Sequence, residues 1–228
     1  MSQKKSNKVL PLVLVAFVSM VIGAGAFTFL QKPDAESLAK QESSEALAAL
    51  QENLHTSLAL PTDFKTVQEF ELLDVNDAPI TQAVFEDKWS LVFFGFTHCP
   101  DVCPITLQVM KDVVANLKEQ GQPQPQIVFV SVDPVRDTAD ILKQYIGYFD
   151  EDFIGITGDV TGIHDLSRSL GIVASFTAND SDPENYGVDH TASLLLIDDQ
   201  RRVRAKITPP HEAAKIVDDY LLLTAAPS

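Results

Sequence analysis

The chain has 228 residues, a length that fits either one large domain or two small ones. Its formal net charge is −15, because 32 acidic residues outnumber 17 basic ones. This acidity argues against non-specific nucleic-acid binding, which needs cations that displace phosphate counterions. The chain holds only Cys99 and Cys103, too few cysteines for a disulfide scaffold or a four-cysteine zinc site.

The segment Val9–Leu30 carries no charged side chain. At about 1.5 Å per residue it is long enough to cross a hydrocarbon core of about 30 Å. Lysines precede it and the first acidic residue, Asp34, follows it, so the positive-inside rule places residues 1–8 in the cytoplasm. We expect a single-pass anchor over 9–30 in a bacterial inner membrane, with the body in the periplasm. A cleaved signal peptide is the alternative, because Ala24-Gly25-Ala26 resembles a cleavage site.

Residues 31–60 are expected to form a stalk between the anchor and the globular domain. Much of this stretch consists of Ala, Glu, Gln and Ser. Four leucines follow one another at helical spacing and predict a short amphipathic helix: Leu47, Leu50, Leu54 and Leu58. Pro61 ends this helix, and residues 61–228 are expected to be one domain.

Strands and helices are predicted to alternate in the domain. Apolar runs typical of buried strands are Ser90–Phe96, Ile127–Val132 and Ala192–Ile197. Helical patterns cover Pro104–Gln120, Thr138–Phe149, Gly162–Leu170 and about Pro210–Leu223. Further strands are expected at Val67–Leu73, before a turn at residues 76–79, at Phe153–Ile156, and at Val203–Ile207, which closes a hairpin. This alternation predicts a three-layer α/β domain.

Cys99 and Cys103 lie where the buried strand Ser90–Phe96 ends and a helix begins. Ligands bind at such junctions in open α/β sheets, and the free amides of a helix N-terminus stabilise a thiolate. The spacing allows the two sulfurs to ligate one ion or to form a small-loop disulfide. A purely structural disulfide is the weaker interpretation, because closing so short a loop removes little chain entropy.

Two thiolates alone under-coordinate most metals, so a third ligand is expected. His190 precedes the buried strand Ala192–Ile197, and if that strand is a parallel neighbour of Ser90–Phe96, the loops at their ends come together. A structural role would be the default for His190 alone, but beside two cysteines we predict a ligand. The other histidines are expected in the stalk, on the opposite face of the strand end, or on helix surfaces: His55, His98, His164 and His211.

Three blocks of sequence resemble the signatures of the Sco/SenC family, thioredoxin-fold copper chaperones for cytochrome c oxidase assembly. The blocks are GFTHCPDVCP (Gly95–Pro104), SVDPVRDT (Ser131–Thr138) and YGVDHTASLLLID (Tyr186–Asp198). They occur in the family's order within a match that runs through about residues 61–223. A pair of cysteines at this spacing is by itself only weakly specific for the family, whereas the three blocks together are highly specific for it.

The resemblance implies that Cys99, Cys103 and His190 bind one copper ion. It also implies that Asp133 lies beside the metal, as a weak ligand or as the partner of a ligand. The implied fold is a thioredoxin-like three-layer α/β domain with an N-terminal β-hairpin extension, preceded by a single transmembrane helix. A second hairpin would be inserted at about Thr177–Gly187. Asp137-Thr138 has the simpler interpretation of a helix cap.

The donor set agrees with this resemblance on chemical grounds. Two soft thiolates and one imidazole suit Cu(I), and leave room for a weak fourth ligand when the ion is Cu(II). Zinc tolerates the same ligands with water in the fourth position. Ligation needs reduced, deprotonated cysteines, so copper loading depends on redox state and pH. A Cys99–Cys103 disulfide would be an unloaded form that a reductant must reopen.

Three functions remain open from the sequence. The first is a copper carrier, a metallochaperone more than an enzyme, that loads the binuclear centre of cytochrome c oxidase subunit II and needs a copper donor and a thiol reductant. The second is a thiol–disulfide oxidoreductase that reduces the cysteines of that target, and the third is a peroxiredoxin-like peroxidase. The cysteine spacing is longer than C-x-x-C and residues 190–193 contain no proline, which favours the carrier.

Overall fold

The computed structural model describes residues 35–178 and 186–226. The chain divides into two compact units, Met1–Glu45 and Ala46–Ser228. Helix α2 (Ala35–Gln51) crosses the boundary between the units. Residues 35–45 are the described part of the first unit, and residues 46–51 belong to the second. The predicted anchor, Val9–Leu30, lies outside the described residues. Among the helices that the structure describes, none has both the length and the apolar character needed to span a bilayer.

The second unit is built on an eight-stranded sheet with the order β1-β10-β9-β4-β5-β6-β2-β3. Three of its strands run parallel and form its centre: β4 (Ser90–Gly95), β5 (Gln126–Ser131) and β6 (Ile154–Thr157). The remaining strands pair antiparallel and are β1 (Ser57–Ala59), β2 (Glu71–Asp74), β3 (Pro79–Thr81), β9 (Leu194–Ile197) and β10 (Val203–Ile207). Every side chain of β4 and β9 is buried, as their continuous apolar runs predict.

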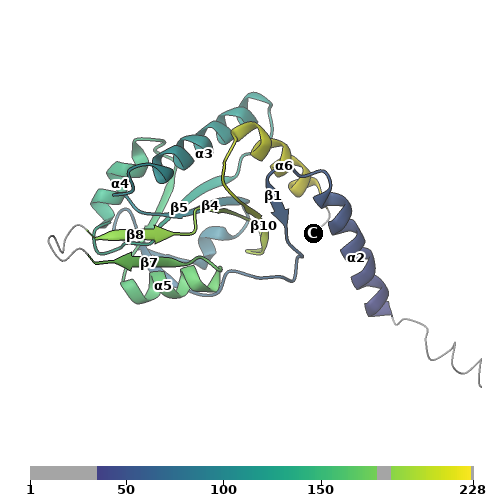
Figure 1. Ribbon diagram of the computed structural model, residues 1–228, viewed down its shortest axis with the longest axis horizontal. Coiled ribbons are helices and arrows are strands. Elements are labelled where there is room, and N and C mark those ends of the chain that lie inside the picture. Colours follow the sequence, from purple (N-terminus) through teal and green to yellow (C-terminus); the bar gives the residue numbers. More distant parts are fainter. Residues whose placement is uncertain (1–34, 179–185, 227–228) are drawn as a thin grey trace, which may run out of the picture. The chain divides into compact units, whose positions relative to one another are not determined.

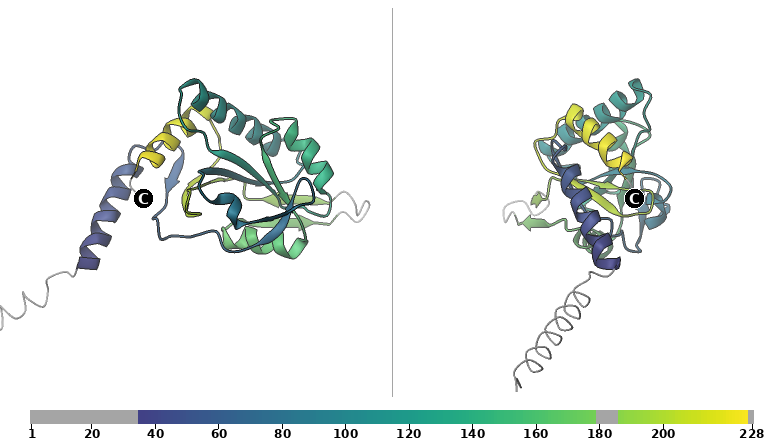
Figure 2. Two further views of the ribbon diagram at one scale, coloured as in Figure 1. Left: turned by 180° about the vertical axis from the view of Figure 1, so that it is seen from behind. Right: turned by 90° about the vertical axis from the view of Figure 1, so that its right-hand side faces the viewer.

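Helices cover both faces of this sheet. They are α3 (Val102–Glu119), α4 (Ala139–Gly147), α5 (Val160–Ser169) and α6 (Ala213–Ala225), and a short 3₁₀ helix, η1 (Gln82–Phe85), follows β3. Figures 1 and 2 show α3, α4 and α6 along one side of the sheet and α5 on the other. The three-layer α/β architecture predicted from the sequence is therefore confirmed.

The N-terminal hairpin is shorter than the strand predicted at Val67–Leu73. Only Glu71–Asp74 is a strand, and it pairs with β3 across the predicted turn, with Leu72 opposite Ile80. The preceding residues have another partner, because the backbone N–H of Val67 donates to the carbonyl of Arg201 at 2.9 Å. The hairpin extension implied by the family resemblance is present.

The inserted hairpin consists of β7 (Ala174–Thr177) and β8 (Gly187–His190). The predicted range, Thr177–Gly187, is wrong because it spans the connection between these strands and only the last pair of their register. Every residue of both strands is exposed or half-buried. A ribbon of this kind has no apolar run that would reveal its strands in the sequence.

Part of the predicted stalk belongs to the second unit. Strand β1 pairs with β10, with Ser57 opposite Ile207, and therefore extends the sheet before residue 61. Leu47, Leu50 and Leu54 pack against the hydrophobic core, whereas Leu58 is 53% exposed. The predicted helix is therefore wrong at its end, because α2 stops at Gln51, before Leu54, and Leu58 lies in β1 and not in a helix that Pro61 closes. Three of the four leucines nevertheless contact the domain.

Candidate metal centre

Both cysteines lie at the junction between β4 and α3. Cys103 is the second residue of α3 and is completely buried, whereas Cys99 lies in the preceding turn and is partly exposed. The backbone N–H of Cys103 points at Cys99 Sγ, with 3.5 Å between nitrogen and sulfur. Amides in the first turn of a helix have no partner within the helix, so this one is free to stabilise negative charge on Cys99.

Gly95 explains how the Cys103 sulfur reaches this position. A Cβ atom on Gly95 would lie 3.0 Å from Cys103 Sγ and 2.9 Å from the Phe129 ring. Only a residue without a side chain therefore allows the sulfur to pack directly against the end of β4. The glycine of the first sequence block has a steric role in the site.

His190 comes to the cysteines through the order and direction of the strands. Strand β9 runs antiparallel to β4, with Leu194 opposite Phe93, so the start of β9 lies at the end of β4. The parallel arrangement expected from the sequence is wrong, since a parallel β9 would begin at the opposite end of β4. His190 is also the last residue of β8 and not part of a loop.

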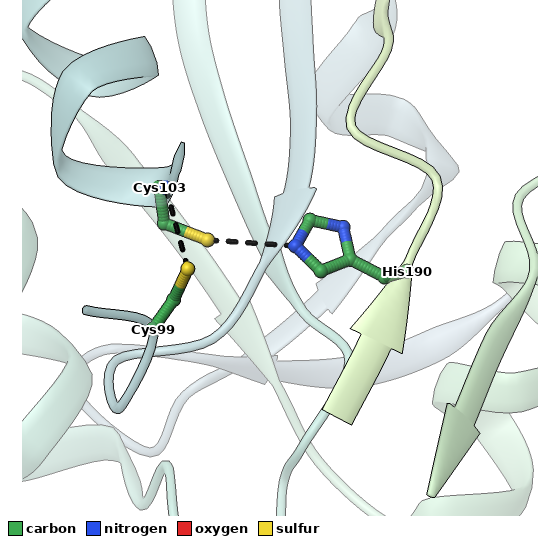
Figure 3. Close-up of side chains that lie close together, drawn as sticks. All are labelled: Cys99, Cys103 and His190. Atoms are coloured by element: carbon green, nitrogen blue, oxygen red, sulfur yellow. Dashed lines mark hydrogen bonds between the residues drawn. The ribbon is translucent and has the colours of Figure 1, made fainter. Parts of the chain in front are cut away.

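Figure 3 shows the His190 ring facing the Cys103 sulfur, with the Cys99 sulfur directed at the same space. The Nε2 atom of His190 lies 3.5 Å from Cys103 Sγ, and Nδ1 lies 3.2 Å from the carbonyl oxygen of Thr191. A carbonyl only accepts hydrogen bonds, so Nδ1 carries the proton and the Nε2 lone pair is directed towards the sulfurs. The rings of Phe93 and Phe96 contact the imidazole edge-on, each with a centroid separation of 5.8 Å.

The ligand atoms of Cys99, Cys103 and His190 all lie within 4.8 Å of one another. Burial lowers the pKa of His190, so its imidazole is neutral and able to ligate at physiological pH. Burial raises the pKa of the Cys103 thiol, and the nearby Cys99 adds to this effect. A bound cation would compensate the cost of deprotonating such a thiol. Two soft sulfurs and an imidazole fit copper, and they are also ligands that zinc accepts.

Asp133 lies outside this group of three. Its buried carboxylate accepts hydrogen bonds from Arg136 Nε at 2.5 Å and from the hydroxyl of Tyr186. The Arg136 guanidinium stacks on the Tyr186 ring, 3.8 Å from its centroid, and donates to the Tyr186 carbonyl. These contacts tie the loop after β5 to the residue that precedes β8. The placement of Asp133 beside a metal stays a prediction.

Asp137 does not use its side chain as a helix cap. The cap residue of α4 is Thr138, and the structure records no capping bond from its side chain. The completely buried Asp137 carboxylate instead accepts hydrogen bonds from Thr97 and from Ser131. The sequence does not reveal this role, because an aspartate before a helix is typical of a cap.

The remaining histidines lie outside the three-residue group. His55, His98 and His164 have side chains that are about half exposed, close to acidic neighbours. The expectation that His211 is exposed is wrong. It is half-buried, and its Nε2 lies 2.9 Å from the carbonyl oxygen of Ala192.

A groove of about 910 Å³ lies beside the centre, between α5 and the inserted hairpin. Asp133 and Tyr186 form part of its wall, and apolar side chains such as Val135, Val160 and Phe176 line its rim. The two cysteines and His190 do not line it. The candidate metal centre is therefore separate from this groove.

A thioredoxin-like domain with two cysteines at a strand–helix junction and a histidine on an inserted hairpin defines a class of metal-binding thioredoxin relatives. Within that class, the family model described as SCO1/SenC matches residues 59–223, well over half of the chain. The chain belongs to the SCO1/SenC family, and the resemblance seen in the three sequence blocks is confirmed.

Three relatives illustrate the similarity. The SCO2-like protein of Rickettsia felis is 32% identical over 196 residues, which are 86% of this chain and 87% of that protein. ScoI of Bradyrhizobium japonicum, solved with copper bound, is 31% identical with a TM-score of 0.60, over 68% of this chain and 96% of that one. Copper-bound ScoI of Arabidopsis thaliana is 28% identical with a TM-score of 0.65, over 70% and 98% of the two chains.

Proposed function

We propose that this protein binds one copper ion through the thiolates of Cys99 and Cys103 and through Nε2 of His190. The observation that carries the proposal is the convergence of three donor atoms within 4.8 Å, from a turn, a helix and a hairpin strand. The carbonyl of Thr191 holds the imidazole in the tautomer that ligation needs. Two relatives with copper bound in their structures support copper as the ion.

Copper is cargo in this proposal, so the site must also release it. Cys99 is partly exposed whereas Cys103 is buried, so an incoming ligand of an acceptor reaches Cys99 first. Stepwise exchange of Cys99, then His190, then Cys103 would transfer the ion without releasing it into water. Asp133 supports the exchange indirectly, because its bonds to Arg136 and Tyr186 hold the hairpin that carries His190.

The acceptor that we propose is the binuclear copper centre of cytochrome c oxidase subunit II during oxidase assembly. The family resemblance supports this acceptor. Residues 9–30 would anchor the chain in a bacterial inner membrane, with 61–228 as the copper-binding domain in the periplasm. An upstream copper donor and a thiol reductant complete the set of partners, because only the dithiol form binds copper.

Thiol–disulfide exchange is a second candidate, favoured by the amide of Cys103 that points at Cys99 Sγ. The Cys99 thiolate would attack a target disulfide, release one target thiolate and form a mixed disulfide. Cys103, once deprotonated, would then displace the second target thiolate. The products are a Cys99–Cys103 disulfide and a reduced target, so two electrons pass from this protein to the target.

Copper competition on the reduced full-length chain tests the binding proposal. We expect one Cu(I) per chain, at least about 10-fold weaker binding in His190→Ala, and unchanged binding in the control His164→Ala, whose imidazole lies half exposed on α5. If His190→Ala binds copper as tightly as the native chain while disulfide reduction depends only on the cysteines, the reductase is the better account.

Transfer is tested by mixing the copper-loaded chain with the copper-free, reduced copper-binding domain of subunit II. We expect the absorption of the binuclear centre to appear in the acceptor. Failure of copper to leave the loaded chain would contradict the carrier function. A reductase acting alone would instead produce free thiols in an oxidised acceptor when copper is absent.

A further inference from the structure

We infer that Asp137 is the positioning residue of the cysteine pair. Its carboxylate is completely buried and accepts three hydrogen bonds. The donors are the backbone N–H of Thr97 at 3.0 Å, the hydroxyl of Thr97 at 2.6 Å and the hydroxyl of Ser131 at 2.6 Å. Burying an ionised carboxylate costs free energy unless hydrogen bonds satisfy it, so the buried Asp137 carboxylate needs these three donors.

Asp137 joins the ends of the three central strands. Thr97 follows the end of β4, and Ser131 is the last residue of β5. The hydroxyl of Thr157, the last residue of β6, donates to the backbone carbonyl of Asp137 at 2.8 Å. Asp137 therefore connects the carboxyl ends of β4, β5 and β6, and the turn that carries Cys99 begins at the end of β4.

The path from Asp137 to Cys99 is short. Thr97 is held at both its backbone N–H and its hydroxyl, and the N–H of Cys99 donates to the carbonyl of Phe96 at 3.2 Å. These bonds bracket the turn and set the position of Cys99 Sγ opposite the amide of Cys103, 3.5 Å away. If Thr97 loses its hydrogen bonds to Asp137, we expect the contact between Cys99 Sγ and the Cys103 amide to weaken first.

The same contacts extend to His98. The Thr97 hydroxyl gives its single proton to Asp137, so it accepts from His98 Nδ1, which lies 3.1 Å away. The exposed imidazole next to Cys99 is oriented by this chain of hydrogen bonds. Asp137 thus acts through Thr97 on both His98 and Cys99.

This inference deepens the proposed function, because it concerns the same cysteines, but its test needs no copper. The reduced, copper-free full-length chain is treated with iodoacetamide at fixed pH, and alkylation of Cys99 is followed by mass spectrometry. Thr97→Val removes only the hydroxyl donor, Asp137→Asn removes the charge, and Thr97→Ser restores the hydroxyl. Asp140→Asn is the matched control, because Asp140 lies exposed in the first turn of α4.

We expect Cys99 alkylation to be at least about five-fold slower in Thr97→Val, the change that loss of one typical hydrogen bond produces. Asp137→Asn also removes a negative charge that disfavours thiolate at the cysteine pair, so this variant is judged by its copper spectrum and not by its alkylation rate. Thr97→Ser and Asp140→Asn should react at the native rate. After copper loading, the sulfur-to-Cu(II) absorption band should shift in Thr97→Val and in Asp137→Asn. Near-ultraviolet circular dichroism establishes that each variant is folded.

Native or faster alkylation in a folded Thr97→Val chain would overturn the inference, even if the chain unfolds at a lower temperature, because it would show a role in stability alone. Thr97→Val decides the matter if Asp137→Asn does not fold. A native chain that binds no copper would refute the proposed function and leave the alkylation result standing. Conversely, native alkylation with intact copper binding would refute only the role of Asp137.

Discussion

Gly95 illustrates how one residue controls the site by having no side chain. A methyl group there would press on Cys103 Sγ at 3.0 Å and on the Phe129 ring at 2.9 Å. We predict that Gly95→Ala destabilises the reduced protein by about 1–3 kcal/mol, because the buried neighbours must shift. Copper affinity should fall as well, since the sulfur is a ligand. Urea unfolding and copper competition measure the two effects.

Gly147→Ala is the control for that substitution. A Cβ at Gly147 meets nothing within 4 Å, and the residue lies at the end of α4. It should leave copper affinity unchanged and stabilise the chain by at most about 1 kcal/mol through helix propensity. Equal effects of the two alanines would contradict the steric role assigned to Gly95.

The residue types of the centre could be predicted from the sequence, but not all of its geometry. Cys99 and Cys103 lie at a junction that their apolar and helical neighbours reveal, and His190 lies in a recognisable block. The partners of Asp137 could not be predicted, because Thr97 is 40 residues away and the local pattern indicates a cap. Only the sheet brings these two residues together.

At the scale of elements, the inserted hairpin is held by Tyr186. Burial and the neighbouring Asp133 raise the pKa of Tyr186 to about 12, so its hydroxyl stays protonated and donates at neutral pH. We predict that Tyr186→Phe weakens the attachment of β8 by about 1.5–3 kcal/mol, the range for a hydrogen bond to a charged group. Hydrogen exchange of the β8 amides should become faster.

Tyr148→Phe is the matched control, because Tyr148 is 84% exposed. In this variant the backbone amides of β8 should exchange at the native rate. Since β8 ends at His190, Tyr186→Phe should also release Cu(I) faster in a chelator chase. Unchanged exchange and unchanged release in Tyr186→Phe would show that the hydroxyl does not hold the hairpin.

Asp219 joins α6 to the start of β1 and to the two residues before it. Burial by itself raises the pKa of Asp219, but hydrogen bonds from the backbone N–H groups of His55, Thr56 and Ser57 outweigh it and lower the pKa overall. The folded-state pKa lies below the unfolded value of about 3.9, so the ionised carboxylate stabilises the fold above that pH. This stability is lost as the pH falls through the folded-state pKa.

We predict that Asp219→Asn lowers the free energy of unfolding at pH 7 by about 1–3 kcal/mol, because a neutral amide replaces the accepting carboxylate. The difference from the native chain should shrink as the pH falls below about 4. Urea unfolding at several pH values measures both effects. Asp218→Asn, next to it and 62% exposed, should follow the native curve. A constant difference at every pH would refute the linkage.

The predictability of an element followed its burial. Strands β4 and β9 are buried on both faces and were predicted from continuous apolar runs. Strands β7 and β8 are largely exposed and gave no such signal. The direction of β9 also escaped prediction, because an apolar run is the same in parallel and antiparallel strands.

At the scale of the whole molecule, the chain combines an uncharged segment at Val9–Leu30 with a strongly acidic remainder. We predict that the full-length chain stays in the membrane fraction of a bacterial cell after alkaline carbonate extraction. A chain that lacks residues 1–30 should appear in the soluble fraction. Release of the full-length chain by carbonate, or an N-terminus processed near Ala26, would contradict an uncleaved anchor.

The central claim is that one copper ion is bound by two sulfurs and one imidazole nitrogen. X-ray absorption at the copper edge of the loaded full-length chain tests it most directly. The account predicts two sulfur neighbours and one nitrogen neighbour in the native chain, and loss of the imidazole signal in His190→Ala. A native spectrum without an imidazole contribution, or one that His190→Ala leaves unchanged, would contradict the account.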